Sequence, residues 1–130
     1  MKPKASEKDV LAALYPKRSK YGVSSKDKRT MDGIVFASKK EMMRYSELKL
    51  IEFAGDIKNL KLQPRFPLSI QEPKRAVSTL ICTYIADFEF WDVKAAKLVI
   101  EDVKGMKTPE YRIKKKLFDV LYHPLKLTEV

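Results

Sequence analysis

Cysteine, histidine and tryptophan each occur once in this chain of 130 residues, and glycine occurs only four times. The single cysteine, Cys82, excludes an internal disulfide, and Cys82 with His123 is too small a set for a zinc site. The few glycines form no glycine-rich phosphate loop. No apolar run is long enough to span a membrane, and residues 1–7 contain no apolar signal-peptide core. We therefore expect a cytoplasmic protein in a reducing compartment, without a membrane partner.

Acidic residues are in the minority, with 17 Asp and Glu against 27 Lys and Arg and a formal net charge of +10. A domain with this charge attracts polyanions, of which nucleic acid is the commonest in cells. The basic residues gather in a loop or arm over residues 17–29 and in a helix that begins near Pro109. A solvated charged surface is the alternative for both segments. The candidate DNA-binding residues are Lys17, Arg18, Lys20, Lys26, Lys28, Arg29, Arg112, Lys114, Lys115 and Lys116.

Hydrophobic periodicity and turn signals predict a mixed α/β fold, in which a central β-sheet is flanked by helices. The length is that of one domain, so we expect a single domain over residues 1–130 whose residues 1–29 form a basic N-terminal arm. The expected elements are a helix over 6–14, a hairpin with Asp32 and Gly33 in its turn, a helix from Ser38 to about Ala54, strands over 60–66, 77–91 and 97–104, a helix from Thr108 to about Tyr122, and a last strand over 125–130.

Two of the strands carry more specific expectations. Pro64 interrupts residues 60–66 and Pro67 ends them, which indicates an edge strand or a bend. Residues 77–91 are a long β-branched and aromatic run, which indicates a central strand with apolar residues on both faces.

One carboxylate, Asp87, lies within this apolar run, and a buried carboxylate requires a cation or hydrogen-bond donors. Asp102 and Lys104 are two residues apart, so they project from the same face of their strand. Because the turn between the two strands is short, hairpin pairing would place Asp87 beside Asp102. The convergence of two carboxylates and an ammonium suits phosphodiester hydrolysis assisted by Mg²⁺ or Mn²⁺. A structural Asp–Lys pair at a strand end is the alternative.

A third acid, Glu41, follows Ser38 at the spacing of a capping box, in which the glutamate reaches back to the backbone N–H of the cap. On a helical wheel Glu41 also lines up with Tyr45 and Leu48, so it would point inward. The helix is only weakly amphipathic, and the periodicity leaves both interpretations open.

Five segments spaced along the chain resemble a known family. They are residues 38–41 (SKKE), 62–66 (LQPRF), 84–88 (YIADF), 99–105 (VIEDVKG) and 108–112 (TPEYR). Together they resemble the small phage-encoded endonucleases of the PD-(D/E)XK superfamily, a family formerly classed as a domain of unknown function. The resemblance extends over residues 21–130. The superfamily also includes Holliday-junction resolvases, transposase end-cleaving subunits and restriction enzymes. The resemblance implies a restriction-endonuclease-like core with a glutamate on its first helix.

The resemblance also implies a role for each candidate residue. Asp87, Asp102 and Glu41 would bind the metal, and Lys104 would be the motif lysine. Ala86 departs from the family pattern, because it stands where the proline that gives the superfamily its name would be.

Two further polar residues are accessory candidates. Glu101 directly precedes Asp102, so a register slip of one residue would exchange the acid that faces the metal. Gln63 occupies a strand position that in related nucleases can approach the active site, although a polar strand residue beside Pro64 is the simpler interpretation.

The function implied by the resemblance is a metal-dependent DNA endonuclease that acts on branched or junction DNA in phage recombination or DNA processing, in the cytoplasm of the host. The chain has little room for a separate sequence-reading domain, which favours recognition of DNA shape. Junction resolution would require two active sites and hence a homodimer. The alternatives are a nuclease-like fold retained only for DNA binding, and a subunit of a larger phage DNA-processing assembly.

Overall fold

The computed structural model describes residues 24–104 and 106–130. By their contacts the residues divide into two compact units, Met1–Met42 and Met43–Val130. The helix expected over residues 6–14 lies outside the described residues, as do Lys17, Arg18 and Lys20. The single domain over residues 1–130 and the basic arm over residues 1–29 stay predictions.

The described part of the first unit contains the hairpin that the sequence predicts. Strand β1 (Thr30–Met31) pairs antiparallel with β2 (Ile34–Val35). Asp32 and Gly33 both adopt positive φ, 52° and 75°, which this turn requires. Before the hairpin, residues expected to form a loop instead form a turn of 3-10 helix, η1 (Lys26–Arg29).

Helix α2 (Lys39–Ala54) agrees closely with the helix expected after Ser38. At its start the Ser38 Oγ accepts a hydrogen bond from the Glu41 backbone N–H at 3.1 Å, which is one half of a capping box. At its end Gly55 adopts a φ of 87°, the left-handed conformation in which glycine commonly stops a helix.

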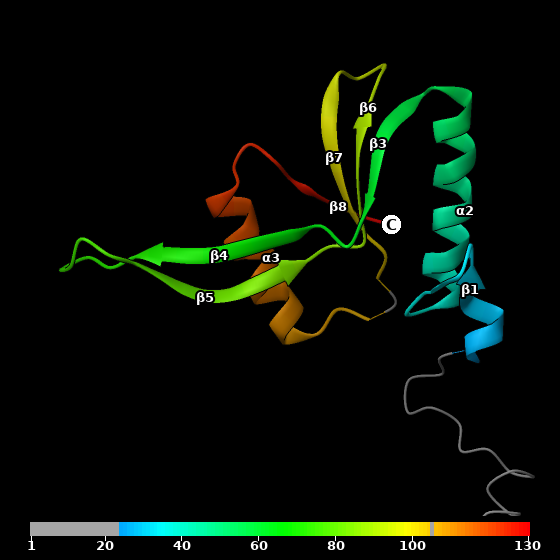
Figure 1. Cartoon of the computed structure of the whole chain (residues 1–130). Helices are drawn as coiled ribbons and strands as arrows, with labels where there is room; N and C mark the ends of the chain where they lie inside the picture. Colours follow the sequence, from blue (N-terminus) through cyan, green and yellow to red (C-terminus); the bar gives the residue numbers. More distant parts are fainter. Residues whose placement is uncertain (1–23, 105) are drawn as a thin grey trace, which may run out of the picture. The chain divides into compact units, whose positions relative to one another are not determined.

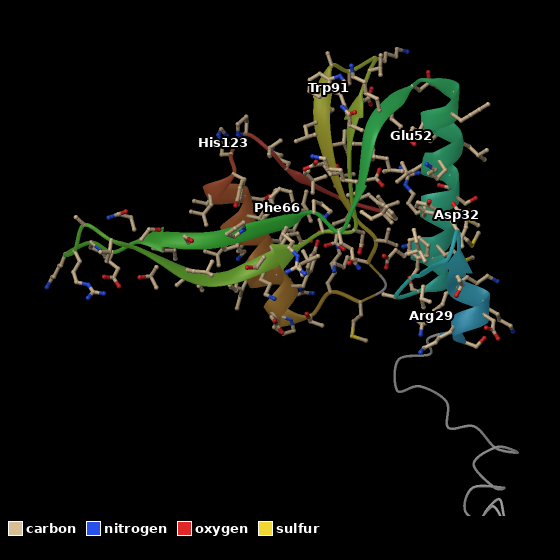
Figure 2. All side chains as sticks on the ribbon, in the orientation of Figure 1. Arg29, Asp32, Glu52, Phe66, Trp91 and His123 are labelled. Carbon is tan, nitrogen blue, oxygen red and sulfur yellow. The ribbon has the colours of Figure 1, made fainter. Side chains whose placement is uncertain are left out.

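The second unit is built on a four-stranded sheet, with the strand order β3-β6-β7-β8. Strands β3 (Ile57–Leu62), β6 (Phe88–Asp92) and β7 (Lys97–Asp102) are antiparallel neighbours, while β8 (Leu127–Glu129) lies parallel to β7. Together with the two helices, this mixed sheet confirms the mixed α/β fold. Figure 2 shows Glu52 extending from α2 toward the sheet, where its Oε2 accepts a hydrogen bond from the backbone N–H of Leu60 at 3.1 Å.

A second sheet in this unit is a long hairpin of β4 (Arg65–Gln71) and β5 (Ser78–Ile85), which extends away from the four-stranded sheet in Figure 1. Helix α3 (Pro109–Leu121) packs against β4 and β8. The rings of Phe66 and Phe118 meet edge to face at 4.9 Å between centroids, and this contact joins the hairpin to the helix. The core cluster consists of Phe66, Leu68, Tyr84, Ala86, Ile100, Tyr111, Phe118 and Leu127. No helix in the described residues is long and apolar enough to cross a membrane.

The strand expected over residues 60–66 is wrong, because the chain turns at Gln63 and forms two strands there. Gln63 has a φ of 50°, outside the extended region, and it separates β3 from β4. Pro67 was expected to end a strand but lies within β4. Within the described residues β4 pairs with β5 alone, so β4 is an edge strand, a position in which proline is tolerated because its missing N–H can face the unpaired side.

The single central strand expected over residues 77–91 is also wrong. It divides at Ala86 and Asp87 into β5 and β6, which belong to different sheets. The Ala86 N–H donates to the carbonyl of Pro64 at 3.1 Å, and the Asp87 N–H donates to the carbonyl of Glu101 at 3.1 Å. The partner strand therefore changes between these two residues, and Asp87 lies at the junction of the two sheets. Strand β7 ends at Asp102, two residues earlier than expected, and Gly105 lies outside the described residues.

Candidate functional site

The junction between β5 and β6 brings Asp87 to the end of β7. Strands β6 and β7 pair antiparallel with Phe88 opposite Glu101, so Asp87 and Asp102 are the next neighbours across the pair. The backbone N–H of Val103 donates to the Asp87 Oδ2 at 2.6 Å. This register confirms the prediction that hairpin pairing brings the Asp87 region beside the Asp102 region, while the convergence of the two carboxylates on one point stays a prediction.

Asp102 is the most deeply buried carboxylate of this pair, with a relative exposure of 1%. Its Oδ1 lies 2.9 Å from the Lys104 Nζ, whereas its buried Oδ2 has no hydrogen-bond partner among the described residues. Burial raises the pKa of Asp102, and the ion pair with Lys104 offsets only part of that rise. A buried carboxylate oxygen without a partner is costly, which indicates that a cation or a donor belongs beside it.

Asp87 is half-buried and is held in place by backbone groups. Its carbonyl accepts from the Gln63 N–H at 2.9 Å, and its Oδ2 accepts from Val103. Burial is again the main reason that the pKa of Asp87 is raised. The backbone of Gln63 therefore contacts the candidate site, and Gln63 is an exposed residue. An accessory role for the Gln63 side chain stays a prediction.

Lys104 occupies the position between the two acids and helix α3. Besides its ion pair with Asp102, its Nζ lies 4.3 Å from the centroid of the Tyr111 ring, a cation–π contact. The Tyr111 hydroxyl donates to the Glu129 Oε1 at 3.1 Å, and burial is the main cause of the raised pKa of Tyr111. The ammonium is thus positioned by a carboxylate on one side and an aromatic face on the other.

Glu101 points to the opposite face of β7 from Asp102, as strand alternation requires. There Arg44 of α2 donates two hydrogen bonds to its carboxylate, from Nε at 2.8 Å and from Nη2 at 2.6 Å. The same bond to Glu101 is the main reason that the pKa of Arg44 is raised. The two neighbouring acids therefore have different partners. Asp102 pairs with Lys104, and Glu101 pairs with Arg44 on the other face of the strand.

Glu41 is buried in the first turn of α2 and belongs to the first unit, whereas Asp87, Asp102 and Lys104 belong to the second. Its backbone N–H is capped by Ser38, which is the serine half of a capping box, while the half in which the Glu41 side chain reaches back to the cap stays a prediction. The prediction that Glu41 joins the two aspartates stays a prediction.

A divalent cation fits Asp87 and Asp102 by the chemistry of their oxygens. Mg²⁺ needs only one or two protein carboxylates, since water and substrate phosphates fill its remaining positions. The unpartnered Oδ2 of Asp102 is an oxygen that such an ion would neutralise. Within residues 24–104 and 106–130 no three His, Cys, Asp or Glu side chains gather as a metal-binding group. A metal ion in the second unit would therefore have to rely on this pair of carboxylates.

Residues 18–130 match a family described as "Protein of unknown function (DUF1064)". The chain belongs to the DUF1064 family. A search of curated proteins gives no match, and a search of solved structures gives none. The description of the family names no activity, so the resemblance to PD-(D/E)XK endonucleases stays a prediction.

Helix α3 of this DUF1064 chain divides its predicted DNA-binding residues between faces. Arg112 and Lys116 are exposed and one turn apart, so they share a face. Lys114 lies about 200° around the helix from Arg112 and forms an ion pair with Glu110 at 3.0 Å. Lys115 lies within 3.8 Å of the carboxylates of Asp119 and Glu129. Arg112, Lys115 and Lys116 thus lie within about 100° of one another around the helix, and Lys114 lies on the opposite side.

In the first unit, Lys26 and Lys28 are exposed on η1. Arg29 instead donates hydrogen bonds to nearby backbone carbonyls. Its Nε donates to the carbonyl of Ser24 at 3.0 Å, and its Nη1 donates to the carbonyl of Phe36 at 2.5 Å. Its guanidinium is therefore already engaged with backbone carbonyls, while the two lysines present their charge to solvent.

Sequence reasoning missed two groups of residues in the DUF1064 site. Arg44 carries no local signal, because its partner Glu101 is 57 positions away in the sequence. Tyr84 and Tyr111 were given no role of their own, yet their rings lie 6.4 Å apart and the Tyr111 ring lies beside Lys104. The alternation of Glu101 and Asp102 along one strand was the available signal that these acids have different partners.

Proposed function

We propose that this chain is a metal-dependent DNA endonuclease, in which Asp87 and Asp102 hold Mg²⁺ or Mn²⁺ beside Lys104. The observation that carries the proposal is the Asp102 carboxylate, which is buried, has one oxygen without a partner, and lies next to Asp87 across two paired strands. The net charge of +10 supports a polyanionic substrate. The resemblance to PD-(D/E)XK endonucleases agrees with both features.

Each residue of the site has a chemical task under this proposal. The ion, when bound, supplies a more acidic water and offsets charge on the phosphate. Asp87 is fixed by the Val103 N–H, which orients its carboxylate toward the end of β7. Asp102 keeps the Lys104 ammonium within 2.9 Å, and that ammonium orients a water or stabilises negative charge on the phosphate oxygens.

A second candidate function is DNA binding without catalysis. The observation that favours it is the absence of any group of three metal-ligand side chains within the described residues. A lone pair of aspartates with one lysine would then be a structural remnant. We also propose that the nuclease acts on branched DNA as a homodimer. Membership of a larger phage DNA-processing assembly is a further proposal.

The test is cleavage of supercoiled plasmid, linear duplex and a four-way junction, each with Mg²⁺, Mn²⁺ or EDTA. Asp87→Asn is expected to lower the rate at least ~100-fold, since removal of one charge-stabilising group costs two to three orders of magnitude. Glu89→Gln is the matched control, because Glu89 is a carboxylate on β6 that pairs with Lys61 at 3.3 Å and lies outside the site. Glu41→Gln tests the role predicted for that residue.

Cleavage that persists in EDTA, or that is equally fast in the Asp87→Asn variant, would remove the catalytic proposal. DNA binding by the wild type without cleavage under any metal would favour the second candidate. A rate that falls equally in Glu89→Gln and Asp87→Asn would show only a general loss of structure, which circular dichroism would detect.

A further inference from the structure

A small pocket of about 210 Å³ lies between the end of β5 and the start of α3. It shares one wall with the candidate metal site, because Lys104 lines the pocket and also contacts Asp102. The other residues that define its chemistry are Tyr84, Thr108, Glu110, Tyr111 and Lys114.

Tyr84 lines this pocket, and its buried hydroxyl is an unexplained polar group. Tyr84 has a relative exposure of 3%, and its hydroxyl has no hydrogen-bond partner among the described residues. Its ring is held firmly, with Tyr111 at 6.4 Å and Phe118 at 5.9 Å between centroids. A buried hydroxyl left without a partner is unfavourable, so a ligand that accepts a hydrogen bond from it would be stabilised there.

The pocket is electropositive as well. Lys104 and Lys114 both line it, and their side chains are 27% and 29% exposed. The N-terminus of α3 also opens here, with Thr108 as its cap and Pro109 in the first turn. The dipole of a helix attracts anions to its first turn, although Thr108 already accepts from the Tyr111 N–H here and Pro109 has no N–H to donate. The unpartnered hydroxyl, the two ammoniums and the helix end therefore all favour one anionic ligand.

Glu110 is the acidic residue that lines this pocket, and it pairs with Lys114 at 3.0 Å. The Glu110 side chain is 76% exposed. Exposed pairs of this kind contribute little, so a phosphate can replace the Glu110 carboxylate at Lys114 while Glu110 turns into solvent.

We propose that this pocket binds a DNA phosphate that neighbours the phosphate to be cleaved. The inference rests on the proposed function for the identity of the ligand, and on Tyr84, Lys104 and Lys114 for the site. Because Lys104 faces both the carboxylate pair and the pocket, a strand whose reacting phosphate lies at Asp102 would reach the pocket with an adjacent phosphate. Tyr84 and Lys114 are thus binding residues that set the register of the strand.

The test measures binding to a fluorescent duplex and to a four-way junction by anisotropy in EDTA, where no cleavage occurs. Tyr84→Phe removes only the hydroxyl and is expected to raise the Kd about tenfold, the effect of one charge-assisted hydrogen bond. Lys114→Gln is expected to reduce the slope of log K against log salt by about one. Lys126→Gln is the matched control, since it makes the same change of charge at an exposed residue outside the pocket.

A second arm uses inorganic phosphate, which separates failure of the pocket from failure of the proposed function. Phosphate is expected to raise the Tm of the wild type above that in chloride of equal ionic strength, and to raise it less in Tyr84→Phe. Equal DNA affinity in the wild type and Tyr84→Phe, with Lys114→Gln no different from Lys126→Gln, would overturn the inference. Phosphate binding at Tyr84 in a chain that binds no DNA would instead overturn the proposed function.

Discussion

Replacing Asp102 by asparagine is expected to stabilise the protein while it removes cleavage. In the wild type the carboxylate is 1% exposed, and only one of its two oxygens has a partner among the described residues. Asparagine has nearly the same shape but no charge, so it retains an acceptor for Lys104 and removes the buried negative charge. Residues of active sites often carry this kind of local instability.

The size of the effect follows from opposing contributions. Burying the carboxylate charge costs several kcal/mol, which the neutral amide removes, but the Nδ2 group that replaces Oδ2 carries donors without a partner, at a cost of about 1–3 kcal/mol. The lost ion pair opposes this gain weakly, because the Lys104 side chain is 27% exposed and can be hydrated in its place. The net expectation is a gain of about 1 kcal/mol without metal, or a rise in Tm of roughly 4 °C.

The gain depends on pH with a definite sign. Burial raises the folded-state pKa of Asp102 above the unfolded value, so the folded state binds the proton more tightly. The ionised carboxyl therefore destabilises the wild type above its folded pKa, and this penalty is absent below the unfolded pKa of about 3.9. The advantage of asparagine is expected to grow as the pH rises from about 4 and to be complete once the pH exceeds the folded-state pKa of Asp102.

Thermal unfolding of wild type and Asp102→Asn, with and without Mg²⁺, is the measurement. Mg²⁺ at ten times its Kd is expected to stabilise the wild type by about 1.4 kcal/mol and to leave the variant unchanged. Asp92→Asn is a suitable control, since Asp92 caps a turn through a hydrogen bond from the Ala95 N–H at 2.9 Å that asparagine can also accept. A less stable Asp102→Asn variant at neutral pH would refute the reasoning, because Asp102 would then be a structural ion-pair partner. Equal stabilisation of both proteins by Mg²⁺ would exclude Asp102 as a ligand.

Two other predictions concern the neighbouring charges. Arg44→Met leaves the buried Glu101 carboxylate without its arginine, so urea unfolding is expected to show a loss of about 3 kcal/mol, and adding Glu101→Gln is expected to restore much of it. A loss that the second substitution leaves unchanged would show that Arg44 acts through packing. Because burial raises the pKa of both Asp87 and Asp102, protons compete with the metal above the ordinary aspartate pKa of about 3.9. Calorimetric titration with Mg²⁺ is therefore expected to show weaker binding and proton release as the pH falls toward that value, and pH-independent binding down to 3.9 would contradict this.

The helices and the short hairpin could be predicted because their signals are local. Asp32 and Gly33 adopt the positive φ that their turn needs, Gly55 ends α2, and Thr108 caps α3 by accepting from the Tyr111 N–H at 3.2 Å. In each case the residues that decide the structure lie within a few positions of the element itself.

The strands were predicted less well because their ends are decided by distant partners. Nothing within residues 77–91 marks the break at Ala86, which arises because the Pro64 carbonyl and the Glu101 carbonyl bind successive N–H groups. The pairing of Asp87 with the end of β7 could be predicted, since the turn from Asp92 to Lys97 is short and fixes the register. The bidentate contact of Arg44 with Glu101 joins residues 57 positions apart, and no local pattern specifies it.

The unpartnered polar atoms give the proposed metal site and the proposed phosphate pocket a common basis. Within the described residues, three buried side-chain polar atoms have no hydrogen-bond partner: the Tyr84 hydroxyl, the Asp102 Oδ2 and the Asp119 Oδ1. The first two lie on residues that flank Lys104, one lining the pocket with it and one paired with it at 2.9 Å. Folded proteins satisfy nearly all of their buried polar groups, so two exceptions on residues that neighbour Lys104 support the proposals that ligands bind there. A cation at Asp102 and a phosphate at Tyr84 carry opposite charges, and a phosphodiester strand with its metal ion supplies both.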